Sequence, residues 1–143
     1  MFWVTQANAR VDRVACPWLI KRFIDKEAQF LYVAPDQVLP TAKAVKGKSF
    51  DATGADYGHR GNLCTFEVLV QDSGLGKDAA LMKLAHIVHA ADVEGDLNTV
   101  PEGAGLFAFS EGLHTAVADD HRKVALAGPL YDALYVYCGG KTA

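Results

Sequence analysis

The sequence predicts an α+β fold, with a small mixed β-sheet formed mainly by the N-terminal half and a helical layer formed by the C-terminal half. Two short runs of aromatic and β-branched residues, 2–6 and 29–34, flank a segment whose apolar residues recur at helical spacing. From residue 77 onward the apolar spacing is helical almost throughout. The chain has 143 residues and contains no repeat or linker, so we expect one domain over 1–143.

The N-terminal half predicts strands separated by helix and loop. FWVTQ at 2–6 favours a strand, and QFLYVA at 29–34 favours a second strand that ends at Pro35. SFDA at 49–52 suggests a short third strand, after which TGADYGHRGN, with three glycines, predicts a loop. LCTFEVLV at 63–70 is the most strand-like run in the chain.

The C-terminal half predicts three helices. The first, over 77–93, has an apolar stripe formed by Leu81, Leu84, Ala85 and Val88. The T-x-x-E pattern of Thr99 and Glu102 predicts a capping box before a helix over roughly 100–117. Asp119 or Asp120 can cap the last helix, which Gly128-Pro129 could interrupt and which Gly139-Gly140 should end.

Composition excludes several classes of protein. The net charge of −3 argues against a general affinity for nucleic acid. Three widely separated cysteines without a CxxC pair argue against a disulfide framework and favour a reducing compartment. The N-terminus does not resemble a signal peptide and no apolar run reaches the ~18 residues of a membrane span, so we expect a cytoplasmic protein without a membrane partner. No phosphate-binding GxxxxGK[ST] or hydrolase GxSxG motif is present.

Four polar residues in these elements form a candidate metal site. Glu67 lies in an otherwise apolar run, where a carboxylate is costly unless it is paired or bound to a metal. His89 and Asp92 are three residues apart on a predicted helix, so their side chains can converge, and His59 lies in the glycine-rich loop. This mixed set suits iron, manganese or zinc. Ordinary alternatives remain open: Glu67 exposed on an edge strand or paired with an arginine, and a polar helix border at His89 and Asp92.

The segment around Cys16-Pro17 allows two interpretations. If a helix begins at Cys16, Pro17 occupies the first turn, and the positive helix end together with Arg10 and Arg13 would lower the thiol pKa and attract a small anion. If the helix begins near Asp12, Pro17 lies inside it and removes one hydrogen bond.

Three segments carry a resemblance to a known family. RVDRVACPWLIKRFID (10–25), SFDATGADYGHRGNLCTFEVL (49–69) and IVHAAD (87–92) resemble the chromate-resistance ChrB-type domain. The resemblance implies a role in chromate resistance or sensing; any DNA binding by an additional domain of longer members does not carry over. The matching motif residues are Asp12, Arg13, Trp18, His59, Cys64, Thr65, Glu67, His89 and Asp92. Ala90 departs from the acidic residue that often follows the histidine of IVH in the family.

The first functional hypothesis is therefore a domain that binds one divalent metal and a small oxyanion such as chromate. Its ligands would be His59, Glu67, His89 and Asp92, with Arg13 supporting them or contacting the oxyanion. One alternative is a sensor or interaction module without metal, with the oxyanion on Arg10, Arg13 and the helix start, and another is thiol redox chemistry at Cys16. The residues leave catalysis open, and the aromatic YDALYVY end could be core or a homodimer face.

Overall fold

A computed structural model describes residues 1–143 and contains one small sheet. Its strands are β1 (Phe2–Gln6), β2 (Gln29–Val33) and β3 (Lys48–Ser49), in the spatial order β2-β1-β3. Both strand pairs are parallel, because a helical connection carries the chain back to the same end of the sheet each time. The predicted α+β class with an N-terminal sheet is confirmed, although the sheet is parallel throughout rather than mixed.

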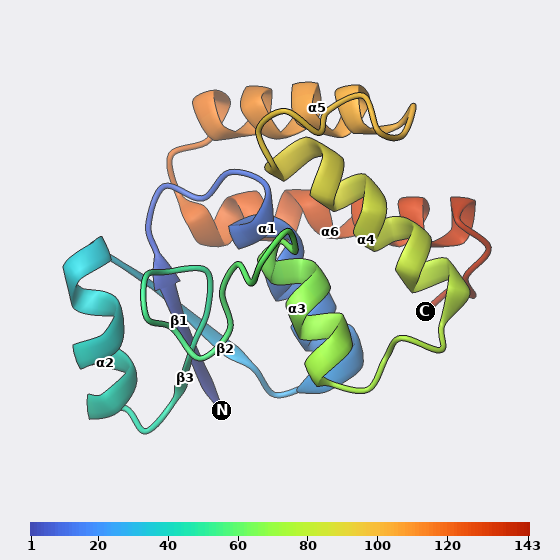
Figure 1. Cartoon of the computed structure of the whole chain (residues 1–143). Helices are drawn as coiled ribbons and strands as arrows, with labels where there is room; N and C mark the ends of the chain where they lie inside the picture. Colours follow the sequence, from blue (N-terminus) through green and yellow to red (C-terminus); the bar gives the residue numbers. More distant parts are fainter.

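Helices cover both sides of this sheet (Figure 1). They are α1 (Asp12–Leu19) with a π-helical continuation (Ile20–Ile24), a 3-10 turn (Pro35–Gln37), α2 (Val38–Ala44), α3 (Thr65–Asp72), α4 (Ala79–Asp92), α5 (Gly103–Ala116) and α6 (Asp120–Tyr137). Only α2 lies on one side of the sheet, where Val4, Val38 and Ala42 form a small core. The other side holds the main core of 27 buried residues, to which α1, α3, α4 and α6 contribute.

The region predicted as the strongest strand, 63–70, is instead the start of helix α3. Five of the eight residues of α3 are buried. A short run that is apolar all round does not distinguish a buried strand from a buried helix. The deciding contacts are non-local, because the first N–H groups of α3 bind the carboxylate of Asp12, 53 residues earlier.

The observed limits of helix α1 decide between the two interpretations of the Cys16-Pro17 segment. Helix α1 begins at Asp12, so Pro17 lies inside it and Cys16 lies in its middle with no exposed surface. The interpretation that placed Cys16 at a helix N-terminus is therefore wrong. Helix α6 likewise continues through Pro129 and ends before Gly139, whose φ of 105° suits glycine.

The three C-terminal helices are confirmed with small shifts at their ends. The predicted Thr99–Glu102 capping box does not form, because the Thr99 hydroxyl donates to the Asp96 carbonyl and the Glu102 carboxylate accepts from the Tyr137 hydroxyl. In the YDALYVY end, Tyr131 and Tyr135 are core residues. None of the helices combines the length and the apolar character needed to cross a membrane.

Candidate functional site

Asp12 connects helix α1 to helix α3. It is the first residue of α1 and only 1% exposed. Its carboxylate accepts the backbone N–H groups of Thr65 at 2.9 Å and Phe66 at 3.3 Å, which are the unpaired donors at the start of α3. A negative charge at this helix end is stabilised by the helix dipole. The charge of Asp12 is thus held in the interior by the backbone of another element.

Asp51 follows strand β3 and turns the chain into the glycine-rich loop. Its φ of 50° lies in the left-handed region, which aspartate adopts more readily than most residues with a side chain. Its carboxylate accepts the Thr65 hydroxyl at 2.7 Å and lies 3.5 Å from Nε of Arg13. Both Asp51 and Asp12 are therefore anchored at the start of α3.

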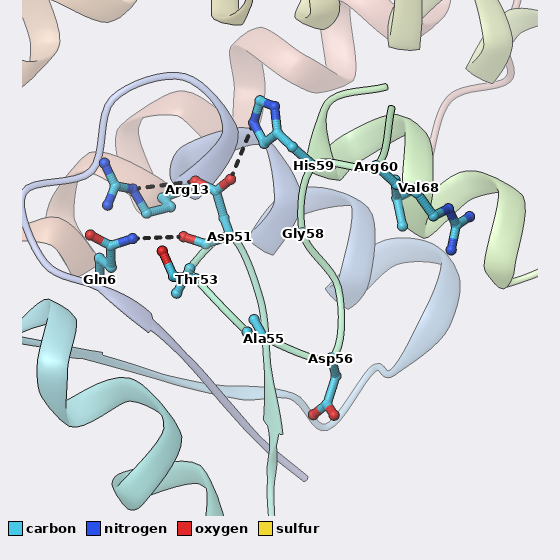
Figure 2. A pocket seen from close by; sticks show the side chains of 12 residues that line it. Gln6, Arg13, Asp51, Thr53, Ala55, Asp56, Gly58, His59, Arg60 and Val68 are labelled. Atoms are coloured by element: carbon cyan, nitrogen blue, oxygen red, sulfur yellow. Dashed lines mark hydrogen bonds and ion pairs between the residues drawn. The ribbon is translucent and has the colours of Figure 1, made fainter. Parts of the chain in front are cut away.

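His59 approaches these carboxylates from the glycine-rich loop. Its Nε2 atom lies 3.4 Å from Asp12, 3.5 Å from Asp51 and 3.2 Å from Asp92, measured to a carboxylate oxygen of each. Figure 2 shows His59 and Arg13 reaching Asp51 from opposite sides. One ring nitrogen has a single hydrogen to donate, so it cannot satisfy three carboxylates. Asp12, Asp51, His59 and Asp92 are called the aspartate–histidine cluster below.

The aspartate–histidine cluster crowds negative charge into a partly dry space. Burial, followed by the charges of Asp12 and Asp51, raises the pKa of Asp92 to about 8. Burial also raises the pKa of Asp12, and hydrogen bonding to Asp12 and Asp51 raises the pKa of His59 to about 10. Burial disfavours the Asp51 carboxylate too, but contacts with His59, Thr65 and Arg13 outweigh it and lower its pKa. Without a bound cation, the cluster therefore retains protons at neutral pH.

A cavity of about 540 Å³ opens beside this cluster. Asp51 and His59 lie on its wall, together with Gln6, Arg13 and Arg60 (Figure 2). The two arginines bring positive charge to a space large enough for a small oxyanion. Arg60 also forms a two-fold contact with the Asp72 carboxylate, at 2.7 and 3.1 Å.

A second set of polar side chains connects the start of α3 to the end of α4. One Glu67 carboxylate oxygen accepts the Cys64 N–H at 3.0 Å and contacts Nδ1 of His89. The other ring nitrogen of His89, Nε2, lies 2.6 Å from an Asp96 oxygen. Burial lowers the pKa of His89, but the contacts with Asp96 and Glu67 more than offset it, so the pKa is raised. Cys64, Glu67, His89 and Asp96 are called the cysteine–histidine cluster below.

The four predicted metal ligands therefore divide between two clusters. His59 and Asp92 meet in the aspartate–histidine cluster, whereas Glu67 and His89 meet in the cysteine–histidine cluster. His89 and Asp92 are adjacent on one face of α4, but they contact different partners. Cys64 was not among the predicted ligands, yet its sulfur lies with Glu67 and His89 just before helix α3.

Sequence reasoning missed Asp12 and Asp51 as members of a ligand set. The resemblance names Asp12, and Asp51 lies within the predicted strand at 49–52, so both carried a weak signal. Asp96, which orients His89, lies seven residues beyond it and outside the predicted helix. Only packing brings these carboxylates to the histidines.

The residues expected to hold an oxyanion without metal do not converge. Arg10 is exposed and binds both oxygens of Glu111, at 2.6 and 2.7 Å, while Arg13 lines the cavity. Burial, with a smaller contribution from Asp12, raises the pKa of Cys16 well above its usual value. This is opposite to the lowered pKa that redox chemistry at Cys16 requires.

Comparisons with known proteins place the chain in a family. The family described as "ChrB, C-terminal domain" matches residues 3–138. Protein ChrB of Cupriavidus metallidurans is 36% identical over 140 residues, which cover 94% of this chain and 40% of that protein. The chain thus spans less than half the length of this curated relative, and no solved structure gives a significant match. The chain belongs to the ChrB C-terminal domain family, which is the chromate-resistance type of domain.

Proposed function

We propose that this domain binds one divalent metal ion between Asp12, His59 and Asp92. The observation that carries the proposal is the position of one imidazole nitrogen within 3.5 Å of oxygens from three aspartates. Donor atoms bonded to a common ion at about 2.1 Å lie roughly 3.0–3.5 Å apart, so the spacing suits a shared cation. The three ligand atoms also lie within 4.8 Å of one another.

The donor set favours particular metals. Carboxylate oxygens suit manganese and magnesium, whereas an imidazole suits iron and zinc. A set with one imidazole and two or three carboxylates is thus best matched to manganese, iron or zinc. Asp51 can act as a further ligand or can hold Arg13 at the cavity, since its two oxygens face His59 and Arg13 respectively.

The metal would also make the adjacent cavity attractive to an anion. The Asp51 carboxylate on the cavity wall repels an oxyanion when it is not neutralised. A bound cation would supply that neutralisation, and Arg13 on the cavity wall would then be able to contact the anion. We therefore propose a small oxyanion such as chromate as the ligand, in keeping with the chromate-resistance family. The geometry supports binding and singles out no reaction.

Binding of an oxyanion without metal has less support. Arg10 is paired with Glu111 and Arg13 lies beside Asp51, so each already has an acidic partner.

The cysteines are all free and buried, which supports a reducing compartment such as the cytoplasm as the place of action.

The test of the metal site is manganese binding to protein purified without a metal-affinity tag. Titration with Mn²⁺, followed by elemental analysis, should give about one equivalent for the unchanged chain. The double variant His59→Ala/Asp92→Asn should lose it, because two of three ligands are gone. Glu111→Gln is the matched control, since it also neutralises a carboxylate that faces a cation. Full manganese content in the double variant would remove the basis of the proposal.

The test of the oxyanion is calorimetric titration with chromate and with sulfate. Both titrations are made on metal-free protein and on protein loaded with manganese. We expect binding only to the loaded protein, and a weaker affinity in Arg13→Ala. Equal affinity in the two states would favour the sensor without metal.

A further inference from the structure

The cysteine–histidine cluster contains the donors of a second, chemically different site. The Cys64 sulfur, a Glu67 oxygen and a His89 nitrogen lie within 4.8 Å of one another. Cys64 is fully buried, and the side chains of Glu67 and His89 are 13% and 15% exposed. None of these three residues belongs to the aspartate–histidine cluster.

His89 is oriented as metal-binding histidines usually are. Such histidines donate the N–H of one ring nitrogen to a carboxylate, which leaves the other nitrogen directed at the metal. Here Nε2 of His89 lies 2.6 Å from Asp96, so Nδ1 faces Glu67. In the absence of a metal, contact with two ionised carboxylates requires both ring nitrogens to carry hydrogen, which is the charged imidazolium.

Helix α3 positions the other two donors. Cys64 is the residue that immediately precedes α3, and its backbone N–H donates to Glu67 at 3.0 Å. This contact holds the Glu67 carboxylate between Cys64 and His89. Burial, with the nearby charge of Asp12, raises the pKa of the Cys64 thiol, so the thiol is neutral until a cation displaces its proton.

Access to the cluster is available from the surface. A cavity of about 300 Å³ is lined by Glu67, His86, His89, Thr99 and Val100. Two of the three donors therefore lie on its wall, and His86 is exposed on the same wall. An ion can reach Glu67 and His89 without passing the aspartate–histidine cluster.

We propose that Cys64, Glu67 and His89 bind a second divalent ion of the thiophilic class, to which zinc and cobalt belong. A thiolate and an imidazole select such ions over manganese or magnesium. On binding, the thiol and Nδ1 of His89 release their protons to solvent, while Asp96 keeps its contact with Nε2. This site does not depend on the proposed function of the aspartate–histidine cluster.

The test uses Co²⁺ alone, because cobalt bonded to a thiolate gives a charge-transfer band in the near ultraviolet. Wild-type protein under reducing conditions should develop this band as Co²⁺ is added. Cys64→Ser should lack the band, whereas the control variants Cys16→Ser and Cys138→Ser should retain it. Serine is a preferred residue before a helix, so Cys64→Ser is expected to fold. His89→Gln provides a second variant, in which the band should weaken or shift.

Two outcomes would overturn the inference: no band in the wild type with excess Co²⁺, or a full band in Cys64→Ser. His89 would then serve as an imidazolium that links Glu67 to Asp96. The His59→Ala/Asp92→Asn variant should keep the band even though it loses manganese. The two proposals can therefore fail separately.

Discussion

The two clusters lie against the same helices, α3 and α4, yet they balance buried charge in different ways. In the aspartate–histidine cluster, three carboxylates face one imidazole nitrogen, and only Arg13 adds a further positive charge. In the cysteine–histidine cluster, each nitrogen of His89 meets one carboxylate, and Asp96 is 41% exposed to water. The first cluster is short of positive charge and stands to gain most from a cation. In the second cluster, a protonated His89 meets both carboxylates without a metal ion. A metal ion would add the bond to the Cys64 sulfur.

The largest expected effect is that of removing Asp12. Asp12→Ala leaves two buried N–H groups at the start of α3 without an acceptor, and each costs about 1–3 kcal/mol. We expect the free energy of unfolding to fall by about 3 kcal/mol, measured by urea denaturation. Asp12→Asn should cost less, because an amide oxygen still accepts one N–H and repulsion with Asp51 and Asp92 is relieved. If both variants were as stable as wild type, Asp12 would not anchor α3.

The next effect is the pH dependence of stability in the metal-free protein. The folded-state pKa of Asp92, about 8, exceeds its unfolded value, and the same holds for His59 at about 10. The folded protein therefore holds more protons than the unfolded chain. The stabilisation from protonated Asp92 is lost as the pH rises from about 4 to 8, and that from protonated His59 is lost from about pH 6.5 to 10. Asp92→Asn should flatten the fall below pH 8 in melting-temperature measurements.

Manganese affinity should have the opposite pH dependence from the stability of the metal-free protein. A bound ion requires Asp92 and His59 to be deprotonated, so manganese affinity should increase with pH between 6 and 8. Calorimetric titrations in buffers with different ionisation enthalpies should show proton release on binding. Affinity that is independent of pH would contradict the protonation states assigned to the aspartate–histidine cluster.

A smaller effect is expected in the cysteine–histidine cluster. Glu67→Gln keeps an oxygen for the Cys64 N–H but removes the charge beside His89. We expect a loss of about 1 kcal/mol in the free energy of unfolding and a lower pKa for His89, followed by NMR titration of its ring. His59 serves as the internal control, because its pKa should not change. An unchanged His89 pKa would show that Glu67 does not stabilise the imidazolium.

The smallest effect is expected at the exposed pair of Arg10 and Glu111. Glu111→Gln breaks a contact in solvent, where screening removes most of its value. Melting temperature and manganese affinity should both match wild type. A clear loss of manganese affinity would mean that the surface charges near α5 influence the site.

Part of this architecture was predictable from local pattern. The strands at 2–6 and 29–34 have β-branched and aromatic runs, and α4 carries its apolar stripe within 14 consecutive residues. The glycine-rich loop around His59 was also recognisable from composition. In these segments, periodicity and turn residues act over a few positions, so the sequence alone identifies them.

The α3 region shows why the rest was not predictable. Its apolar run fits a strand as well as a buried helix, and the carboxylate of Asp12 that receives its first N–H groups belongs to α1. The predicted ligand set joined Glu67 to His59 and omitted Cys64, whereas packing places Glu67 with Cys64 and His89.

The sequence by itself determined the α+β class, the family, and which residue types were available for a site: histidines, carboxylates and a cysteine in three segments. The tertiary structure alone decided how they are grouped. Asp12, Asp51, His59 and Asp92 come from a helix start, a strand end, a loop and a helix end, and they meet only when α1, α3 and α4 pack. The physical reason is that the direction of a side chain is set by its own element, whereas its neighbours are set by burial of the shared core.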